Sequence, residues 1–234
     1  NRLSSSGHAE CTRDRPPRGF RACAGLIGRS SGWADRARGI LVWAGLTTAV
    51  AVPVTAAAVS PLLAWREPIY ILAGFAGVIA LALLLIQPLL AGGYLPGMPA
   101  LKGRQVHRLV GGVLVAAVIL HVAGLWVTSP PDVIDALLFR SPTPFSFWGV
   151  VAMWAVFASA LVAAFRRRFH LHAWRITHTV LAVVIVVGSI VHALLIEGTM
   201  ETVSKAVLCG LVFAATVRAI AGLRGWTIRA RRDS

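Results

Sequence analysis

Residues 106–128 read VHRLVGGVLVAAVILHVAGLWVT, and residues 173–196 read AWRITHTVLAVVIVVGSIVHALLI. Each apolar stretch holds two histidines fourteen positions apart: His107 and His121 in the first, His178 and His192 in the second. Over fourteen residues an α-helix rises about 21 Å and turns almost four times, which leaves the two histidines about 40° apart on one face. Two such helices side by side would present two histidine pairs at two depths of a membrane.

A single histidine in an apolar helix is usually only hydrogen-bonded to a neighbour. Four at a repeated spacing indicate function, because ionisable groups within membrane spans are costly and rare. Ligands about 21 Å apart on one helix cannot share one metal ion, whereas two facing imidazoles can be the axial ligands of a haem iron. The spacing therefore predicts two bis-histidine haems.

Small and aromatic residues near the histidines are compatible with this prediction. Small residues one turn inward share the face of each histidine and would leave room for a flat macrocycle: Gly111, Ala117, Ala182 and Gly188. Three tryptophans are candidates to pack on a porphyrin, although tryptophans near span ends are also ordinary interface anchors: Trp126, Trp154 and Trp174.

The composition is that of a membrane protein. The 234 residues are 57% hydrophobic and 14% charged, with a mean hydropathy of +0.74, values typical of multi-pass chains. The net charge of +14 lies in the N-terminal segment and between the apolar stretches, so it reports topology, and we expect no nucleic-acid partner. The cysteines (Cys11, Cys23 and Cys209) lack paired metal-ligand spacing, and we expect Cys11 and Cys23 to be reduced.

Six apolar stretches are each long enough to cross about 30 Å of hydrocarbon as a helix. They cover residues 39–63, 69–91, 106–128, 145–165, 173–196 and 202–222. We therefore predict an all-α membrane protein, a bundle of six transmembrane helices over 39–222, with the haems stacked between the third and fifth. Residues 1–38, rich in Ser, Gly, Pro and Arg, are expected to be a disordered basic cytoplasmic leader, and 223–234 a basic cytoplasmic tail.

The connections between the six stretches alternate in charge. The leader, the second and fourth connections and the tail carry an excess of Lys and Arg, whereas acids offset the bases in the others. The positive-inside rule then predicts that both termini are cytoplasmic, in the inner (plasma) membrane. The third and fifth helices would run parallel, which pairs the histidines by depth: His107 with His178 on the cytoplasmic side, His121 with His192 toward the outside.

Basic side chains flank the inner pair. Arg104, Arg108 and Arg175 lie at the height where haem propionates would be, which makes them candidate cofactor-binding residues. Topology and contact with lipid head groups are the competing roles. His170 and His172 belong to the Arg-rich fourth connection and are predicted to be interfacial rather than ligands.

On these six spans and four histidines, the chain resembles the ferric reductase-like transmembrane domain family over residues 39–222. That family includes eukaryotic ferric reductases, the membrane domains of NADPH oxidases, and the bacterial haem-binding membrane subunit of the periplasmic methionine sulfoxide reductase system. The resemblance implies b-type haem bound by the histidines of the third and fifth spans, and electrons passed across the membrane from a cytoplasmic donor.

Two features qualify that implication. The larger family members carry FAD- and NADPH-binding domains after the sixth span, but no GxGxxG-like loop occurs here. The expected donor is therefore a separate cytoplasmic flavoprotein, a quinol, or FMN or FAD bound at the surface. The cytochrome b subunit of quinol-oxidising complexes shares the histidine spacing, but it has additional spans and quinone-site motifs that are not found here.

The leading prediction is a transmembrane electron-transfer cytochrome with two haem b groups in lipid. Its acceptor outside would be ferric iron, oxygen or a periplasmic partner protein. Whether it is an oxidoreductase by itself or the membrane component of one stays open. Two alternatives without haem are a non-catalytic anchor or assembly subunit and a proton-coupled transporter; the lack of a membrane-embedded acid disfavours the transporter.

Overall fold

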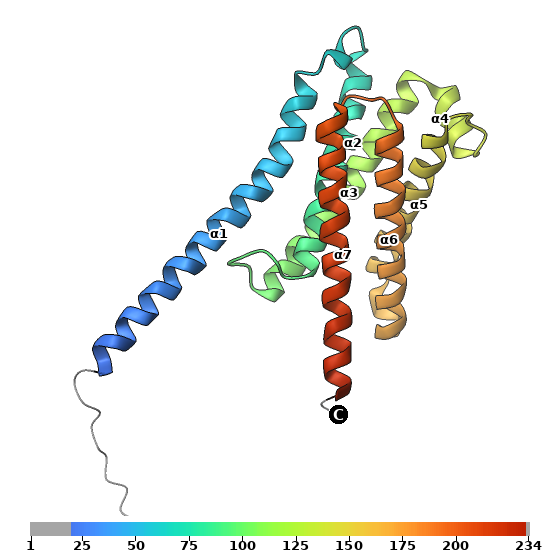
Figure 1. The fold of residues 1–234 in the computed structure, drawn as a ribbon. Coiled ribbons are helices and arrows are strands. Elements are labelled where there is room, and N and C mark those ends of the chain that lie inside the picture. Colours follow the sequence, from blue (N-terminus) through green and yellow to red (C-terminus); the bar gives the residue numbers. More distant parts are fainter. Residues whose placement is uncertain (1–19, 233–234) are drawn as a thin grey trace, which may run out of the picture. The chain divides into compact units, whose positions relative to one another are not determined.

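The structure, a computed structural model, describes the backbone of residues 20–232 and the side chains of residues 33–222. Regular structure in this part of the chain is entirely helical. The elements follow in order (Figure 1), with η marking short 3-10 helices: α1 (Phe20–Ala58), η1 (Pro61–Leu63), α2 (Pro68–Ala91), α3 (Ala100–Thr128), α4 (Pro130–Leu137), α5 (Pro144–Ala164), η2 (Arg166–Arg168), α6 (Leu171–Leu195) and α7 (Thr202–Arg232).

Six of these helices hold stretches long and apolar enough to cross a membrane. They are α2, α3, α5 and α6 over their whole lengths, Trp33–Ala58 of α1 and Thr202–Gly222 of α7. The number of spans and the all-helical class predicted from the sequence are confirmed, and the chain is a multi-pass membrane protein.

The chain divides into two units, residues 1–41 and 42–234. In the first unit the described backbone belongs to α1, which starts at Phe20 although the sequence predicts a disordered leader over 1–38. At the other end α7 continues to Arg232, into the predicted tail. Residues 1–19 of the leader, residues 233–234 of the tail and the side chains of Cys11 and Cys23 lie outside the described residues.

Some helix ends differ from the predicted ones for local reasons. Helix α1 ends at Ala58 rather than at residue 63, because Ser60 caps a separate 3-10 turn by accepting a hydrogen bond from the Leu62 amide at 3.3 Å. Helix α3 begins at Ala100 instead of residue 106, immediately after Pro99. Helix α4 was not predicted, because its eight residues are too short to show a helical period.

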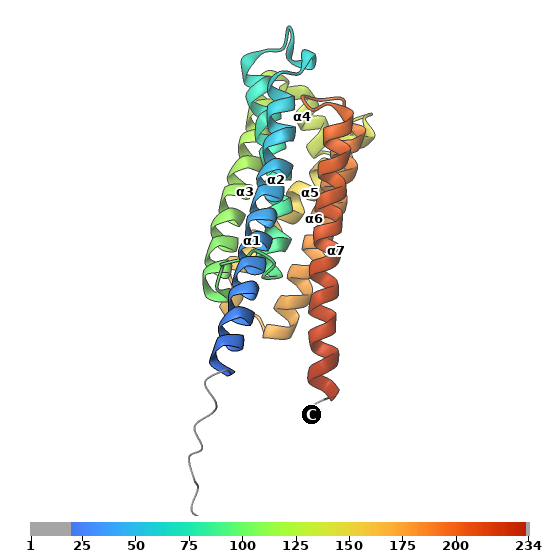
Figure 2. The ribbon, with the colours of Figure 1, turned by 60° about the vertical axis from the view of Figure 1, so that its left-hand side comes forward.

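Two helical hairpins make up most of the second unit. Helix α2 packs on α3, helix α5 packs on α6, and α7 lies against both α2 and α6 (Figure 2). Glycines let the partners approach closely: a Cβ added at Gly124 would be 2.7 Å from Cβ of Ala73, and one at Gly188 would be 3.0 Å from Cβ of Ala152. Each hairpin therefore contributes one histidine-bearing helix, α3 or α6.

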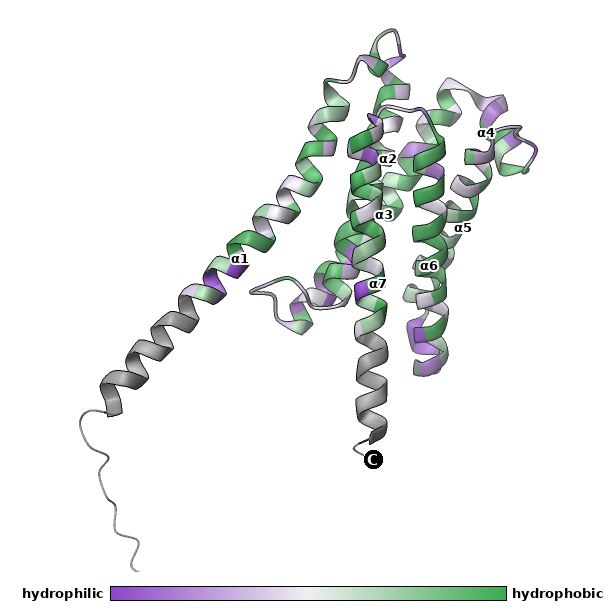
Figure 3. Cartoon of the chain, viewed as in Figure 1, coloured by the Kyte–Doolittle hydropathy of each residue, from purple (hydrophilic) through white to green (hydrophobic). Residues whose placement is uncertain are grey.

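Hydrophobic residues run along the helices, and hydrophilic residues gather at helix ends and connections (Figure 3). Many large apolar side chains are exposed, for example Leu109 and Leu161, as expected for helices whose solvent is lipid. Inside the second unit, Leu208 and Val212 of α7 are fully buried and belong to a cluster with apolar residues of α2, α3, α5 and α6.

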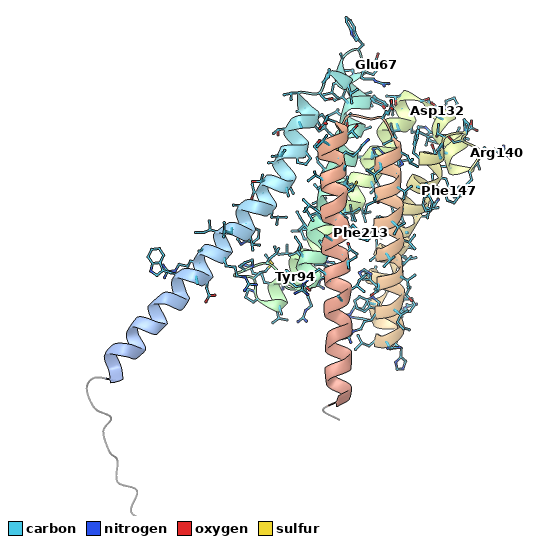
Figure 4. All side chains as sticks on the ribbon, in the orientation of Figure 1. Glu67, Tyr94, Asp132, Arg140, Phe147 and Phe213 are labelled. Atoms are coloured by element: carbon cyan, nitrogen blue, oxygen red, sulfur yellow. The ribbon has the colours of Figure 1, made fainter. Side chains whose placement is uncertain are left out.

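The two ends of the second unit carry different connections. Glu67, Asp132 and Arg140 lie at one end, and Tyr94 lies toward the other (Figure 4). The hydroxyl of Tyr94 donates to the Arg218 carbonyl at 3.0 Å, and the Arg218 guanidinium lies 5.2 Å from the Tyr94 ring centre. These contacts fasten the α2–α3 connection to α7.

Candidate functional site

The two hairpins bring the histidines together in two pairs. In the His107 pair, His107 of α3 faces His178 of α6 with ring centres 6.3 Å apart. In the His121 pair, His121 of α3 faces His192 of α6 with ring centres 6.4 Å apart. These are the partners that the sequence predicts to lie at like depth, and ligation of haem by them stays a prediction.

The ring separation within each pair suits one metal shared between two imidazoles. A metal lies about 2 Å from the imidazole nitrogen that binds it, so two imidazoles on opposite sides of one iron have ring centres about 6 Å apart. Among the side chains that the structure describes, no three His, Cys, Asp or Glu residues gather to hold an ion. The pairs therefore fit a haem iron better than an ion bound by protein alone.

Main-chain carbonyls orient both rings of the His121 pair. Nδ1 of His121 donates to the Ala73 carbonyl at 2.7 Å, and Nδ1 of His192 donates to the Phe145 carbonyl at 2.8 Å. A carbonyl oxygen can only accept, so Nδ1 carries the proton and the lone pair is left on Nε2. This is the tautomer in which histidine binds a metal through Nε2.

Glycines on the neighbouring helices make room for the same two rings. Gly77 lies one turn after Ala73, and a Cβ there would be 3.0 Å from Nδ1 of His121. Gly149 lies one turn after Phe145, and a Cβ there would be 2.7 Å from Nδ1 of His192. The two hairpins thus use the same cradle, a carbonyl followed by a glycine on the next turn.

The His121 pair lines a cavity of about 690 Å³. Its walls are mainly apolar side chains of α2, α3 and α5, such as Leu81, Leu114 and Met153. Cofactor and small-molecule sites commonly enclose about 300–1,000 Å³. The cavity therefore has the size and the apolar lining that a porphyrin beside this pair requires.

One buried cation belongs to the wall of this cavity. Lys205 of α7 is only 6% exposed, and its Nζ donates to the Ile196 carbonyl at 2.7 Å. Among the described residues no carboxylate pairs with it. A buried charge without a counter-ion is costly, and an ammonium has three donors, so Lys205 is suited to an anionic group inside the cavity.

The His107 pair is held by side chains instead of carbonyls. Nδ1 of His178 and Oγ of Ser159 are hydrogen-bonded at 3.2 Å, whereas Nδ1 of His107 is buried without a partner. The ring of Trp174 stacks on His178 with centres 5.4 Å apart and planes 10° apart. The Arg166 guanidinium lies 5.4 Å from the centre of the Trp174 ring, a distance at which a cation attracts an aromatic face.

The predicted arginines lie at the surface. Arg104, Arg108 and Arg175 are exposed, and Arg166 is the arginine that joins the stack on His178. A role for the first three in cofactor binding therefore remains a prediction. Of the other residues weighed from the sequence, Trp174 is part of the site, while His170 and His172 are exposed.

Two of the small residues expected to leave room for a macrocycle face neighbouring helices instead. A Cβ at Gly111 would lie 3.1 Å from Nε2 of Gln87 on α2, and one at Gly188 would lie 3.1 Å from the Trp148 carbonyl on α5. The structure corrects that expectation: these glycines allow close helix packing.

The sequence also contains a signal for some site residues that the predictions above do not include. Gly149 follows Gly77 by 72 positions, and Phe145 follows Ala73 by the same interval. Comparing the two hairpins as an internal repeat would have paired the two glycines, Gly77 and Gly149. Lys205 could have been singled out as a lone lysine within the predicted span 202–222.

Comparison with known proteins gives one match. The model of the family described as "Ferric reductase like transmembrane component" matches residues 73–189, half of the chain. The matched segment contains His107, His121 and His178 and ends three residues before His192. Neither the curated proteins nor the solved structures contain a match.

Proposed function

The chain belongs to the family of ferric reductase-like transmembrane components, and we propose that it is a membrane cytochrome that carries electrons through two b-type haems. The observation that carries the proposal is the arrangement of the two histidine pairs. Their ring centres are 6.3 and 6.4 Å apart, and they lie fourteen residues, or about 21 Å of helix, from one another. Each haem, when bound, would supply a one-electron carrier.

The residues of the chain would hold and orient the two groups. The Nε2 atoms of the four histidines would hold the haem irons, with Nδ1 of His121 and of His192 kept protonated by carbonyl acceptors. Lys205 would neutralise a propionate beside the His121 pair. At the His107 pair, the buried Nε1–H of Trp174 has no acceptor, and with Arg166 it would receive a propionate there.

The remaining walls would exclude water. Apolar side chains of α2, α3 and α5 line the cavity of the His121 pair, and an apolar surrounding with few exposed polar groups is one of the means by which proteins set a haem potential.

The charges at the two ends of the second unit indicate which end faces the cytoplasm. The end of the His107 pair carries Lys102, Arg104, Arg108 and the arginines of η2, and these segments contain no acid. At the other end Glu67 and Asp132 offset Arg140 and the neighbouring Arg66 (Figure 4). By the positive-inside rule the His107 pair is the cytoplasmic one. Electrons would enter there from a separate flavoprotein, a flavin or a quinol, and leave from the His121 pair toward ferric iron, oxygen or a periplasmic partner.

The test is a reduced-minus-oxidised absorption spectrum of the full chain purified in detergent, with haem quantified per chain. We expect two low-spin b-type haems. His192→Ala should lose the haem of the His121 pair and His178→Ala that of the His107 pair, each leaving one haem per chain. His172→Ala, an exposed histidine on the same helix, is the matched control and should retain both.

The outcomes separate the alternatives. Absence of Soret absorption after expression with adequate haem would overturn the proposal and leave an anchor or a transporter. Retention of both haems in His192→Ala would contradict the ligand assignment.

A further inference from the structure

Three buried side-chain atoms in the described part of the chain lack any hydrogen-bond partner: Oε1 of Gln87, Nδ1 of His107 and Nε1 of Trp174. All three belong to the surroundings of the His107 pair, since Trp174 stacks on His178 and Gln87 contacts His107. Nε2 of Gln87 donates to the His107 carbonyl at 3.4 Å. Buried polar atoms nearly always have a hydrogen-bond partner, so three atoms without one at the same place call for an explanation.

The internal repeat shows what is missing at His107. The other three histidines each have a partner for Nδ1 on the neighbouring helix of the same hairpin: Ala73 for His121, Phe145 for His192 and Ser159 for His178. Ser159 follows Phe145 by fourteen residues, the spacing of the histidines themselves.

Gln87 follows Ala73 by the same fourteen residues. It therefore occupies, in the α2–α3 hairpin, the position that Ser159 occupies in the α5–α6 hairpin. Its amide lies against the turn that follows His107, because a Cβ at Gly111 would be 3.1 Å from its Nε2.

The two unpaired atoms here, Oε1 of Gln87 and Nδ1 of His107, are chemically complementary. Oε1 of an amide only accepts, and Nδ1 of a histidine that binds metal through Nε2 only donates. We propose that Gln87 is the positioning residue of His107: in the haem-loaded protein its Oε1 accepts the hydrogen bond from Nδ1 of His107. This inference rests on the proposed function, because it concerns the orientation of a haem ligand.

The consequence is a difference in control between the two haems. An acceptor on Nδ1–H makes the imidazole a stronger donor to the metal, which stabilises the ferric state and lowers the reduction potential. At the His121 pair these acceptors are main-chain carbonyls, which every residue type supplies. At the His107 pair they are the side chains of Gln87 and Ser159, so substitution of side chains can change the hydrogen bonds on Nδ1 at this pair but not at the His121 pair.

The experiment is a redox titration of the full-length haem-loaded chain, with the ferric electron paramagnetic resonance spectrum recorded in parallel. The haem of the His107 pair is identified as the one that His178→Ala removes. Leucine has nearly the size of glutamine but no hydrogen-bond acceptor, so Gln87→Leu should raise the potential of that haem only. Gln87→Glu restores an acceptor oxygen and should return the potential to the wild-type value or below it.

Ser159→Ala is the second variant, in case Gln87→Leu fails to assemble. It removes the partner of His178 and should shift the same haem in the same direction, with two haems per chain retained. Equal potentials in Gln87→Leu, Gln87→Glu and wild type, or equal shifts of both haems, would overturn the inference while leaving the cytochrome in place. Absence of haem from the wild-type chain would instead overturn the proposed function.

Discussion

The His121 pair and the His107 pair have almost the same ring separation but are built by different means. At the His121 pair, carbonyls of α2 and α5 hold both rings and glycines on the next turn make room for them. At the His107 pair, Ser159 holds one ring, Nδ1 of the other has no partner, and Trp174 and Arg166 stack beside them.

Because of this difference, the two histidine pairs should be sensitive to different kinds of substitution. A carbonyl acceptor cannot be removed by changing its side chain, so the His121 pair is sensitive mainly to bulk and to charge in its cavity. The His107 pair depends on side-chain donors and acceptors, which single substitutions can delete. The two sites should therefore respond to different kinds of change.

The largest effect at the His121 pair, short of replacing a histidine, is expected from Gly149→Ala. Its Cβ would be 2.7 Å from Nδ1 of His192, a contact that forces the ring or the helix to move, so haem content should fall toward one per chain. Gly77→Ala, with the corresponding distance 3.0 Å, should act in the same direction more weakly. Haem per chain and redox titration measure both.

Gly112→Ala is the matched control, because a Cβ there meets nothing within 4 Å. Replacing a glycine inside a helix by alanine stabilises it by about 0.5–1 kcal/mol, so this variant should keep both haems. If Gly149→Ala also kept both haems with unchanged potentials, the cradle would have no role in seating His192.

Lys205→Met should produce an intermediate effect, again confined to the His121 pair. If the proposed haem places a propionate beside Lys205, loss of the cation would leave that propionate unneutralised. This would favour the ferric state and lower the potential of that haem by the equivalent of about 1–4 kcal/mol. The haem-free protein should lose no stability, because methionine removes the cost of burying an unpaired charge.

The control is Lys102→Met, which removes an exposed lysine from the other end of the second unit. Two results would show that Lys205 acts through net charge and not through a local contact. One is a fall in the potential of the His107 haem in Lys205→Met, and the other is an equal shift of the His121 haem potential in Lys205→Met and Lys102→Met.

How far the sequence predicts this site depends on the kind of group involved. The fourteen-residue spacing predicts which histidines meet, because helical rise and rotation follow from backbone geometry alone. The carbonyls of Ala73 and Phe145 carry no side-chain signal, since any residue supplies one. Their role emerges only when α2 packs on α3 and α5 on α6.

The fold shows the same division. The spans were predictable from their length and apolarity, whereas α4 was missed because eight residues with Pro130 at the start resemble a loop in sequence. Gln87 and Ser159 can be identified in the sequence as polar residues in apolar spans. Which histidine each of them lies beside depends on the register between the two helices of its hairpin, and the composition does not determine that register.

The smallest effect is expected from Glu201, which precedes α7 one turn before Lys205. Its carboxylate accepts hydrogen bonds from the amides of Val203 and Ser204 at 3.0 and 3.2 Å, and these bonds lower the pKa of Glu201. A lowered folded-state pKa means that the cap stabilises α7 fully above the unfolded value of about 4.3 and is lost as pH falls through the folded value.

Glu201→Gln should therefore unfold at a slightly lower temperature than wild type at neutral pH, and the gap should close as the pH falls through the lowered pKa of Glu201. Thermal unfolding of the two proteins across that range measures the gap. Because the cap secures the turn that carries Lys205, any change in haem potential should appear at the His121 pair alone. If the difference in unfolding temperature stayed constant with pH, the charge of the Glu201 carboxylate would contribute nothing to the stability of the start of α7. Lys205 would then be held in place by its hydrogen bond to the Ile196 carbonyl and by packing.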